Sequence, residues 1–189
     1  MNALNVKTRL FNLYLNISDF DKAQEIWNEI KSHPFVSSNP YGSQAIMSEY
    51  QLAYLYFLTS DYQQAMIQLN KCDELNKLNK TWYWASLLLE VVILIEQELF
   101  EIAENRLKNL RRLLSRDKHS APRIRHISNI LNEALKNHSE VRKVLISHMT
   151  EDKNVIGIPP SDPFGYEIVA FERWIEQYTS ASKAAVHKA

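Results

Sequence analysis

The scarcity of glycine restricts the fold of this chain more than any other feature of its sequence. Only three of the 189 residues are glycines, namely Gly42, Gly157 and Gly165, whereas an average protein contains about 7%. Tight hairpins and phosphate-binding loops both need residues that tolerate positive φ, and glycine is the usual one. A sheet-rich fold is therefore not expected. Neither of the glycine motifs of nucleotide-binding folds occurs in the sequence.

Apolar residues recur at steps of three and four along almost the whole chain, which predicts an all-α protein. The most apolar run, from Trp82 to Ile95, contains Glu90 and is shorter than the roughly 20 residues needed to span a membrane. We therefore expect a helix that is buried on most sides, and no contact with a membrane.

Charge and cysteine content set further limits. The 22 basic and 22 acidic residues cancel, so the net charge indicates no partner. The single cysteine, Cys72, cannot form an internal disulfide, and the first ten residues lack the apolar core of a signal peptide. Both features predict a cytoplasmic protein.

The residues that usually carry catalysis do not form a recognisable pattern. The six histidines include no H-E-x-x-H motif, and the serines include no G-x-S-x-G motif. We therefore predict a protein that is not an enzyme and that uses neither a metal nor a cofactor.

Three predicted helices begin with the same pattern: an aromatic residue, two spacers, an alanine, three spacers and a large apolar residue. The copies are Phe20-Ala23-Trp27, Tyr62-Ala65-Leu69 and Phe100-Ala103-Leu107. A further step reaches Val141, where a degraded fourth copy could lie. A small residue lets two antiparallel helices approach closely, and the aromatic residue fills the wedge beside their turn.

These residues resemble the tetratricopeptide repeat family. In that family the first helix of each pair has a small residue twelve positions before the alanine and an aromatic residue three positions later. The second copy fits, with Ala53 and Tyr56, but Phe11 and Val91 replace the small residue in the other two. The spacing between copies is also longer than the usual 34 residues.

The resemblance implies a short right-handed solenoid of antiparallel helix pairs that binds other proteins. The residues expected to pack within and between the repeats are Phe20, Ala23, Trp27, Ala53, Tyr56, Tyr62, Ala65, Phe100 and Ala103.

A second apolar stripe runs along the helix that contains Ala53, and its members are Met47, Tyr50, Tyr54 and Phe57. In the resembling family this face lines a groove in which peptides or helices dock, and Asn12 stands at one of the groove positions. We therefore predict a partner-binding groove at these five residues. The alternative is ordinary core, with the stripe covered by a neighbouring repeat or by the last helix.

Basic residues gather between positions 105 and 145, where eleven lysines and arginines face only three acidic residues. Such a segment can bind an acidic protein surface or, less readily, nucleic acid. Its other interpretation is a solvated helix face. The predicted basic patch consists of Arg106, Lys108, Arg111, Arg112, Arg116, Arg123 and Arg125.

Prolines and glycines near the end of the chain divide it into four parts. We predict a repeat domain over 1–156, a proline-rich loop over 157–165, a capping helix over 166–179 and a flexible tail over 180–189. The apolar face of the last helix is expected to cover the final repeat. Docking of that face onto a second copy or another protein is the alternative.

These observations predict a non-catalytic protein–protein interaction module, an adaptor or scaffold that binds a peptide or helix through its groove. The partner would be another protein, with a homodimer as a second option. The alternative function is that of a regulatory helical protein that binds anions or nucleic acid through the basic 105–145 surface.

Overall fold

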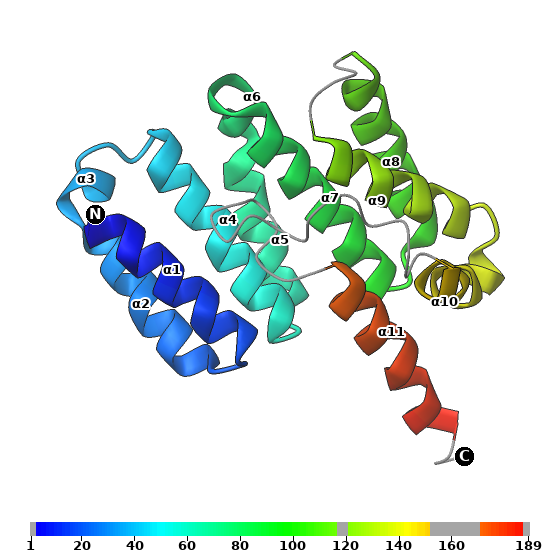
Figure 1. Ribbon diagram of the computed structural model, residues 1–189. Coiled ribbons are helices and arrows are strands. Elements are labelled where there is room, and N and C mark those ends of the chain that lie inside the picture. Colours follow the sequence, from blue (N-terminus) through cyan, green and yellow to red (C-terminus); the bar gives the residue numbers. More distant parts are fainter. Residues whose placement is uncertain (1–2, 117–120, 152–170, 187–189) are drawn as a thin grey trace.

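The computed structural model describes residues 3–116, 121–151 and 171–186, and within these ranges the chain is helical with no strand. The all-α prediction is confirmed. Figure 1 shows the elements in chain order: α1 (Ala3–Asn16), α2 (Phe20–Ser32), α3 (Pro34–Ser37), α4 (Ser43–Leu58), α5 (Tyr62–Asn70), η1 (Lys71–Glu74), α6 (Leu75–Leu78), α7 (Lys80–Glu96), α8 (Phe100–Ser115), α9 (Pro122–Ala134), η2 (His138–Glu140), α10 (Val141–Glu151) and α11 (Phe171–Val186).

Neighbouring helices pack in pairs. The pairs α1/α2, α4/α5 and α7/α8 are each joined by a short turn, and each pair packs against the next one along the chain (Figure 1). Helix α9 packs on α7 and α8, and α10 packs on α9. The short elements α3, η1 and α6 lie in the connections between pairs, which accounts for the long spacing between the repeated sequences.

The three turns inside the pairs have the same backbone geometry. Ser18, Ser60 and Glu98 adopt left-handed conformations, with φ of 60°, 60° and 58°. At each turn the next amide bonds back to a carbonyl of the preceding helix, as in Asp61 N to Tyr56 O at 2.9 Å. This is the Schellman ending, in which the left-handed position is usually occupied by glycine. The sequence lacks glycine at all three positions, so each turn carries some backbone strain.

Aspartates begin the second helices of the first two pairs. Asp19 Oδ1 accepts a hydrogen bond from Lys22 N at 3.3 Å, and Asp61 Oδ1 accepts one from Gln64 N at 3.1 Å. Each aspartate therefore follows a left-handed residue and also caps the next helix. The tight turn leaves the two helices antiparallel and in contact from their first turn onward.

Small residues lie where the paired helices approach each other. Ala23, Ala53, Ala65 and Ala103 are completely buried. The aromatic members of the predicted packing set are partly buried and pack against the core: Phe20, Trp27, Tyr56, Tyr62 and Phe100. At the possible fourth copy, Val141 is buried and the ring of His138 lies 5.4 Å from that of Phe100.

The apolar run within α7 forms the centre of the molecule. All of its residues from Trp82 to Ile95 are buried except Tyr83, which is half-buried. Cys72 is also buried, and burial raises the pKa of its thiol to about 12. None of the described helices combines the length and hydropathy needed to cross a membrane.

The C-terminal helix differs in its bounds from the prediction. It is described from Phe171 and continues to Val186, so residues 180–186 are helical where a flexible tail was expected. This segment contains three alanines and a lysine and neither glycine nor proline, so nothing in it ends a helix. The predicted loop over 157–165 lies outside the described residues.

The strained turns lead to a test of stability. Replacing Ser60 by glycine should raise the free energy of unfolding by about 0.5–1 kcal/mol, because glycine adopts positive φ without a steric cost. Urea denaturation measures the change. Thr59→Gly is the matched control, since Thr59 has φ of −91° and should gain nothing. A loss of stability in Ser60→Gly equal to that of the control would contradict the assignment of strain.

Candidate functional site

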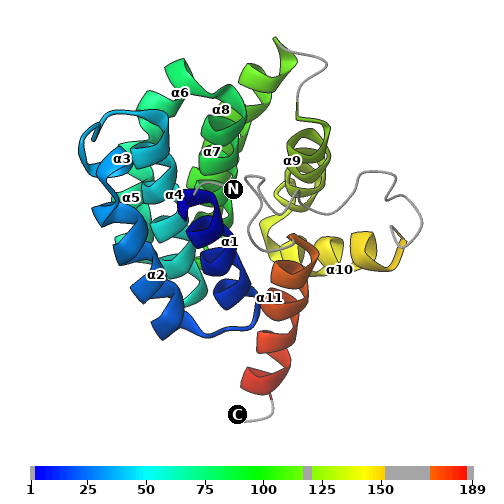
Figure 2. The ribbon, with the colours of Figure 1, turned by 60° about the vertical axis from the view of Figure 1, so that its left-hand side comes forward.

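Helix α11 lies on the side of the molecule formed by α4, α7 and α9, between the end of α1 and α10 (Figure 2). Its buried residues are spaced as one face of a helix: Phe171, Trp174, Ile175 and Tyr178. The rings along this face also contact one another, with 5.1 Å between the centroids of Phe171 and Trp174 and 5.6 Å between those of Trp174 and Tyr178.

The surface beneath this face of α11 is an apolar pocket. Three helices contribute side chains to it, and Phe171 and Trp174 of α11 close it. The lining from the other helices is Tyr50, Tyr54, Phe57, Ala85, Leu88, Leu89, Val92 and Ile127. About 40 Å³ of space remains, enough for one or two water molecules. Phe171 and Trp174 of α11 therefore form one wall of this pocket.

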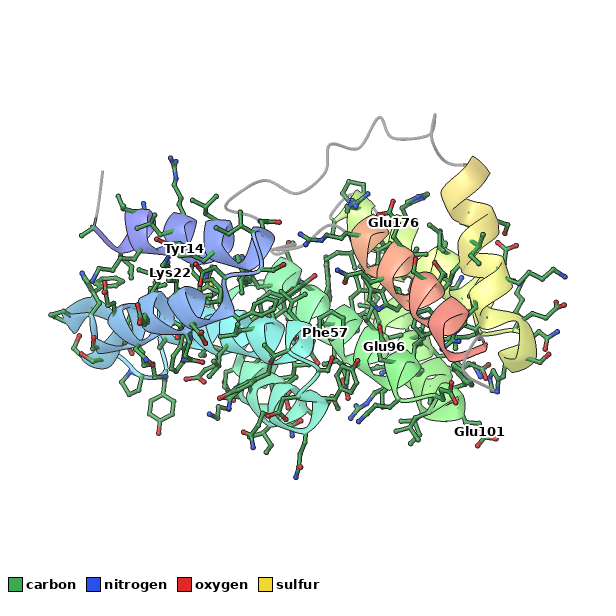
Figure 3. The ribbon with its side chains drawn as sticks, turned by 90° about the horizontal axis from the view of Figure 1, so that it is seen from below. Tyr14, Lys22, Phe57, Glu96, Glu101 and Glu176 are labelled. Atoms are coloured by element: carbon green, nitrogen blue, oxygen red, sulfur yellow. The ribbon has the colours of Figure 1, made fainter. Side chains whose placement is uncertain are left out.

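Polar contacts hold α11 in one register. The Trp174 indole N–H donates a hydrogen bond of 2.7 Å to Glu96 Oε1, at the end of α7. Arg173 donates to the Asn16 carbonyl at 2.9 Å, at the end of α1. Figure 3 shows Glu96 beside α11. A buried indole usually needs such a partner, so the Glu96 contact defines the depth and angle of Trp174.

Arg142 makes the third contact, from α10. Its guanidinium carbon lies 4.8 Å from the centre of the Tyr178 ring, an attractive cation–π arrangement. The same ring is close enough to Glu96 and Glu98 for both to raise the Tyr178 pKa, but burial is the largest cause of that rise. The last turn of the aromatic face is therefore attached to α10.

Glu96 is a partly buried acidic residue in contact with α11. Burial raises the pKa of its carboxyl, and the hydrogen bond from Trp174 opposes that rise. Glu96 and Trp174 border a second cavity of about 220 Å³, together with Phe57, Tyr62 and Tyr178. Burial and the neighbouring Glu96 also raise the pKa of Tyr62.

The predicted groove residues are not an open surface. Tyr50, Tyr54 and Phe57 are between 2% and 9% exposed, because Trp82 packs edge-on against Tyr50 and α11 covers the stripe. The expectation of an exposed groove is corrected in favour of its stated alternative, coverage by the last helix. Met47 is partly buried against the core. Asn12 lies on α1, and neither Met47 nor Asn12 lines the pocket.

The predicted basic patch is divided by the structure. Arg106 pairs with Glu90 at 2.9 Å, and Lys108 pairs with Glu104 at 2.8 Å. Arg111 and Arg112 are exposed on α8, and Arg116, also exposed, directly follows that helix.

Two members of the predicted patch point elsewhere. The prediction that Arg123 belongs to an exposed patch is wrong. Arg123 is only 5% exposed, because it lies one turn before Ile127 on the same buried face of α9. Arg125 is half-buried and donates to the Leu114 carbonyl at 2.9 Å, at the end of α8. Arg123 therefore does not belong to an exposed surface, and Arg125 contributes to one only in part.

Sequence reasoning missed Glu96 and Arg173, which position α11. A partial signal existed for Glu96, because it is the charged residue that directly follows the most apolar run. Its role depends on a residue 78 positions away, and no local pattern identifies that pairing. Among the described residues, the side chains of histidine, cysteine, aspartate and glutamate form no group able to hold a metal ion.

Comparison with known proteins gives no match to a family model, a curated protein or a solved structure. The likeness to tetratricopeptide repeats therefore stays a prediction from the sequence.

The raised pKa of Glu96 predicts a pH dependence. A raised pKa in the folded state means that the neutral carboxyl stabilises the fold, and this contribution is lost as the pH rises through the folded pKa. Glu96→Gln keeps an oxygen for the Trp174 N–H but carries no charge. As the pH rises from about 4 to 7, the free energy of unfolding of the variant should therefore increase relative to that of the natural protein.

Urea denaturation at both pH values measures this difference. Glu101→Gln, on the exposed face of α8, controls for the removal of one surface charge (Figure 3). A stability difference that favours the natural protein more at pH 7 than at pH 4 would show that the hydrogen bonds to the carboxylate outweigh its burial.

Proposed function

We propose that this chain is a non-catalytic protein–protein interaction module whose inner side binds an amphipathic helix of another protein. The proposal includes a short right-handed solenoid of helix pairs similar to tetratricopeptide repeats. It also includes a cytoplasmic location, which the single unpaired Cys72 supports.

The docking of α11 carries this proposal. Its anchors Phe171, Trp174, Ile175 and Tyr178 have the i, i+3, i+4, i+7 spacing with which amphipathic helices enter hydrophobic grooves. The helix is the last described element of the chain. Helix α11 therefore serves as a template for the partner: a helix with aromatic anchors, one of which donates a hydrogen bond to Glu96.

The chemistry of the pocket supports recognition of a helix. Rigid aromatic and aliphatic side chains line the pocket, and few polar groups border it. An apolar helix face that enters the pocket therefore leaves few polar groups without a hydrogen-bond partner. Aromatic anchors in desolvated pockets supply most of the affinity in many interfaces. A partner helix competes with α11 for the same pocket, so α11 lowers the apparent affinity by occupying it.

The anion-binding alternative has less support from the same structure. Of the seven predicted basic residues, two form ion pairs with glutamates and Arg123 is buried. The remaining exposed arginines of α8 could still contact phosphates, but they make a smaller and less continuous surface than the sequence predicts.

Competition by α11 gives the test. A labelled peptide of residues 171–186 should bind the full-length Trp174→Ala variant at least about tenfold more tightly than the natural protein. The substitution removes the main anchor of the internal helix, a change that costs about 3–5 kcal/mol at buried sites. Fluorescence anisotropy measures both dissociation constants.

Two further variants make the result specific. Glu176→Ala alters an exposed residue of α11 and should bind the peptide as the natural protein does. Leu88→Glu, added to Trp174→Ala, places a charge in the pocket and should abolish binding, with circular dichroism confirming the fold. Equal affinity of the natural and Trp174→Ala proteins, or binding that survives Leu88→Glu, would reject the proposal.

A further inference from the structure

A polar cavity lies on the side of α7 opposite the pocket that holds α11. The residues of α7 at that pocket are Ala85, Leu88, Leu89 and Val92, and those at the cavity are Tyr83, Ser86, Leu87 and Glu90. Both sets have the spacing of one helix face, and an offset of two residues rotates one set by about 200° from the other. The cavity is therefore separate from the proposed helix-binding site.

The cavity has a volume of about 340 Å³, at the lower end of the range for small-molecule sites, which begins at about 300 Å³. Helix α7 forms its floor, and α5, η1 and α8 form its walls. The residues that complete its lining are Leu69, Asn70, Asp73, Arg106 and Asn109.

The charges that line the cavity do not balance. Glu90 is only 8% exposed, and its partner is Arg106, whose Nε lies 2.9 Å from Glu90 Oε1. Asp73 faces the same space, and within the part of the chain that the structure describes it forms no ion pair. The lining therefore contains two carboxylates and one guanidinium, and Asp73 is the exposed one of the two carboxylates.

A second buried carboxylate in the same protein shows a different balance. Glu49 of α4 is as buried as Glu90, and it pairs with two lysines, Lys31 and Lys71. Because a buried carboxylate is costly unless its charge is compensated, two cations at Glu49 are the expected arrangement. The cavity at Glu90 has one cation and an additional carboxylate.

Two neighbouring groups respond to this negative charge. Burial is the largest cause of the raised pKa of Glu90; Arg106 opposes that rise, and Asp73 adds to it. Burial likewise raises the pKa of the Tyr83 hydroxyl, followed by Asp73 and then Glu90. Asp73 therefore acts on both groups as a nearby negative charge, in addition to the effect of burial.

We propose that this cavity binds a small organic cation that carries a primary ammonium group on a short aliphatic chain. The ammonium lies between Asp73 and Glu90, where its three donors meet carboxylate and amide oxygens, and the chain lies against Leu69 and Leu87. Anions are excluded by the excess of carboxylates. The same chemistry can come from a free amine or from a lysine side chain of a partner protein.

Calorimetric titration of the full-length protein at low ionic strength tests the site. The probes are 1,5-diaminopentane as a free amine, the methylamide of N-acetyl-lysine as a lysine side chain, and 1,5-pentanediol as the uncharged counterpart. Saturable binding of an amine is expected, with no binding of the diol. The tighter of the two amines identifies the source of the ammonium.

Substitutions connect the binding to these residues. Asp73→Asn and Glu90→Gln should each weaken the amine at least about tenfold, a loss of about 1.4 kcal/mol. Glu74→Gln is the matched control, because Glu74 is adjacent, exposed and paired with Lys77 outside the cavity. Asp73 is exposed, so its variant should fold even if Glu90→Gln does not.

Two results would overturn the proposal. One is the absence of saturable binding of either amine at millimolar concentrations. The other is binding that Asp73→Asn leaves unchanged. Neither result affects the proposed helix-binding site, because the probes contain no helix and α11 does not line the cavity.

Discussion

Close contact between paired helices, at positions where only a small side chain fits, is the constraint on which the rest of this structure depends. Ala23, Ala65 and Ala103 have no exposed surface, and each lies one turn after an aromatic residue that fills the space beside the turn. The left-handed turns at Ser18, Ser60 and Glu98 bring the two helices of each pair into this contact. The first helices of the second and third pairs, α4 and α7, both contribute side chains to the pocket under α11.

That pocket is apolar and needs a cover. A surface lined by Tyr50, Tyr54, Leu88 and Val92 would expose a large apolar area to water, and α11 removes it by inserting Phe171 and Trp174. The hydrogen bond from Trp174 to Glu96 then selects one register among the many that apolar packing alone would allow. The same arrangement stabilises the chain and gives the proposed module a model of its partner.

Helix α7 shows how one element can serve two different environments. One face is apolar and meets α11, whereas the opposite face carries Glu90 towards Arg106 and Asp73. The connection through η1 and α6 places Asp73 at this second face. Because the two faces belong to one helix, the two proposed sites lie close together. One is lined by apolar side chains and the other by charged and polar ones.

The sequence by itself determined the helical class, the paired alanines and the burial of α7. Each of these follows from local periodicity or from the glycine content, which need no knowledge of distant residues. Whether the Tyr50–Tyr54–Phe57 stripe is core or an open groove was decided only by the tertiary structure, because its cover comes from α11, more than a hundred residues later. The same holds for Arg123, whose charge suggested a surface although its helix face turns inward, and for Glu96, whose partner is remote in sequence. Local patterns reveal which faces are apolar or charged, whereas packing between distant segments decides which of those faces meet water.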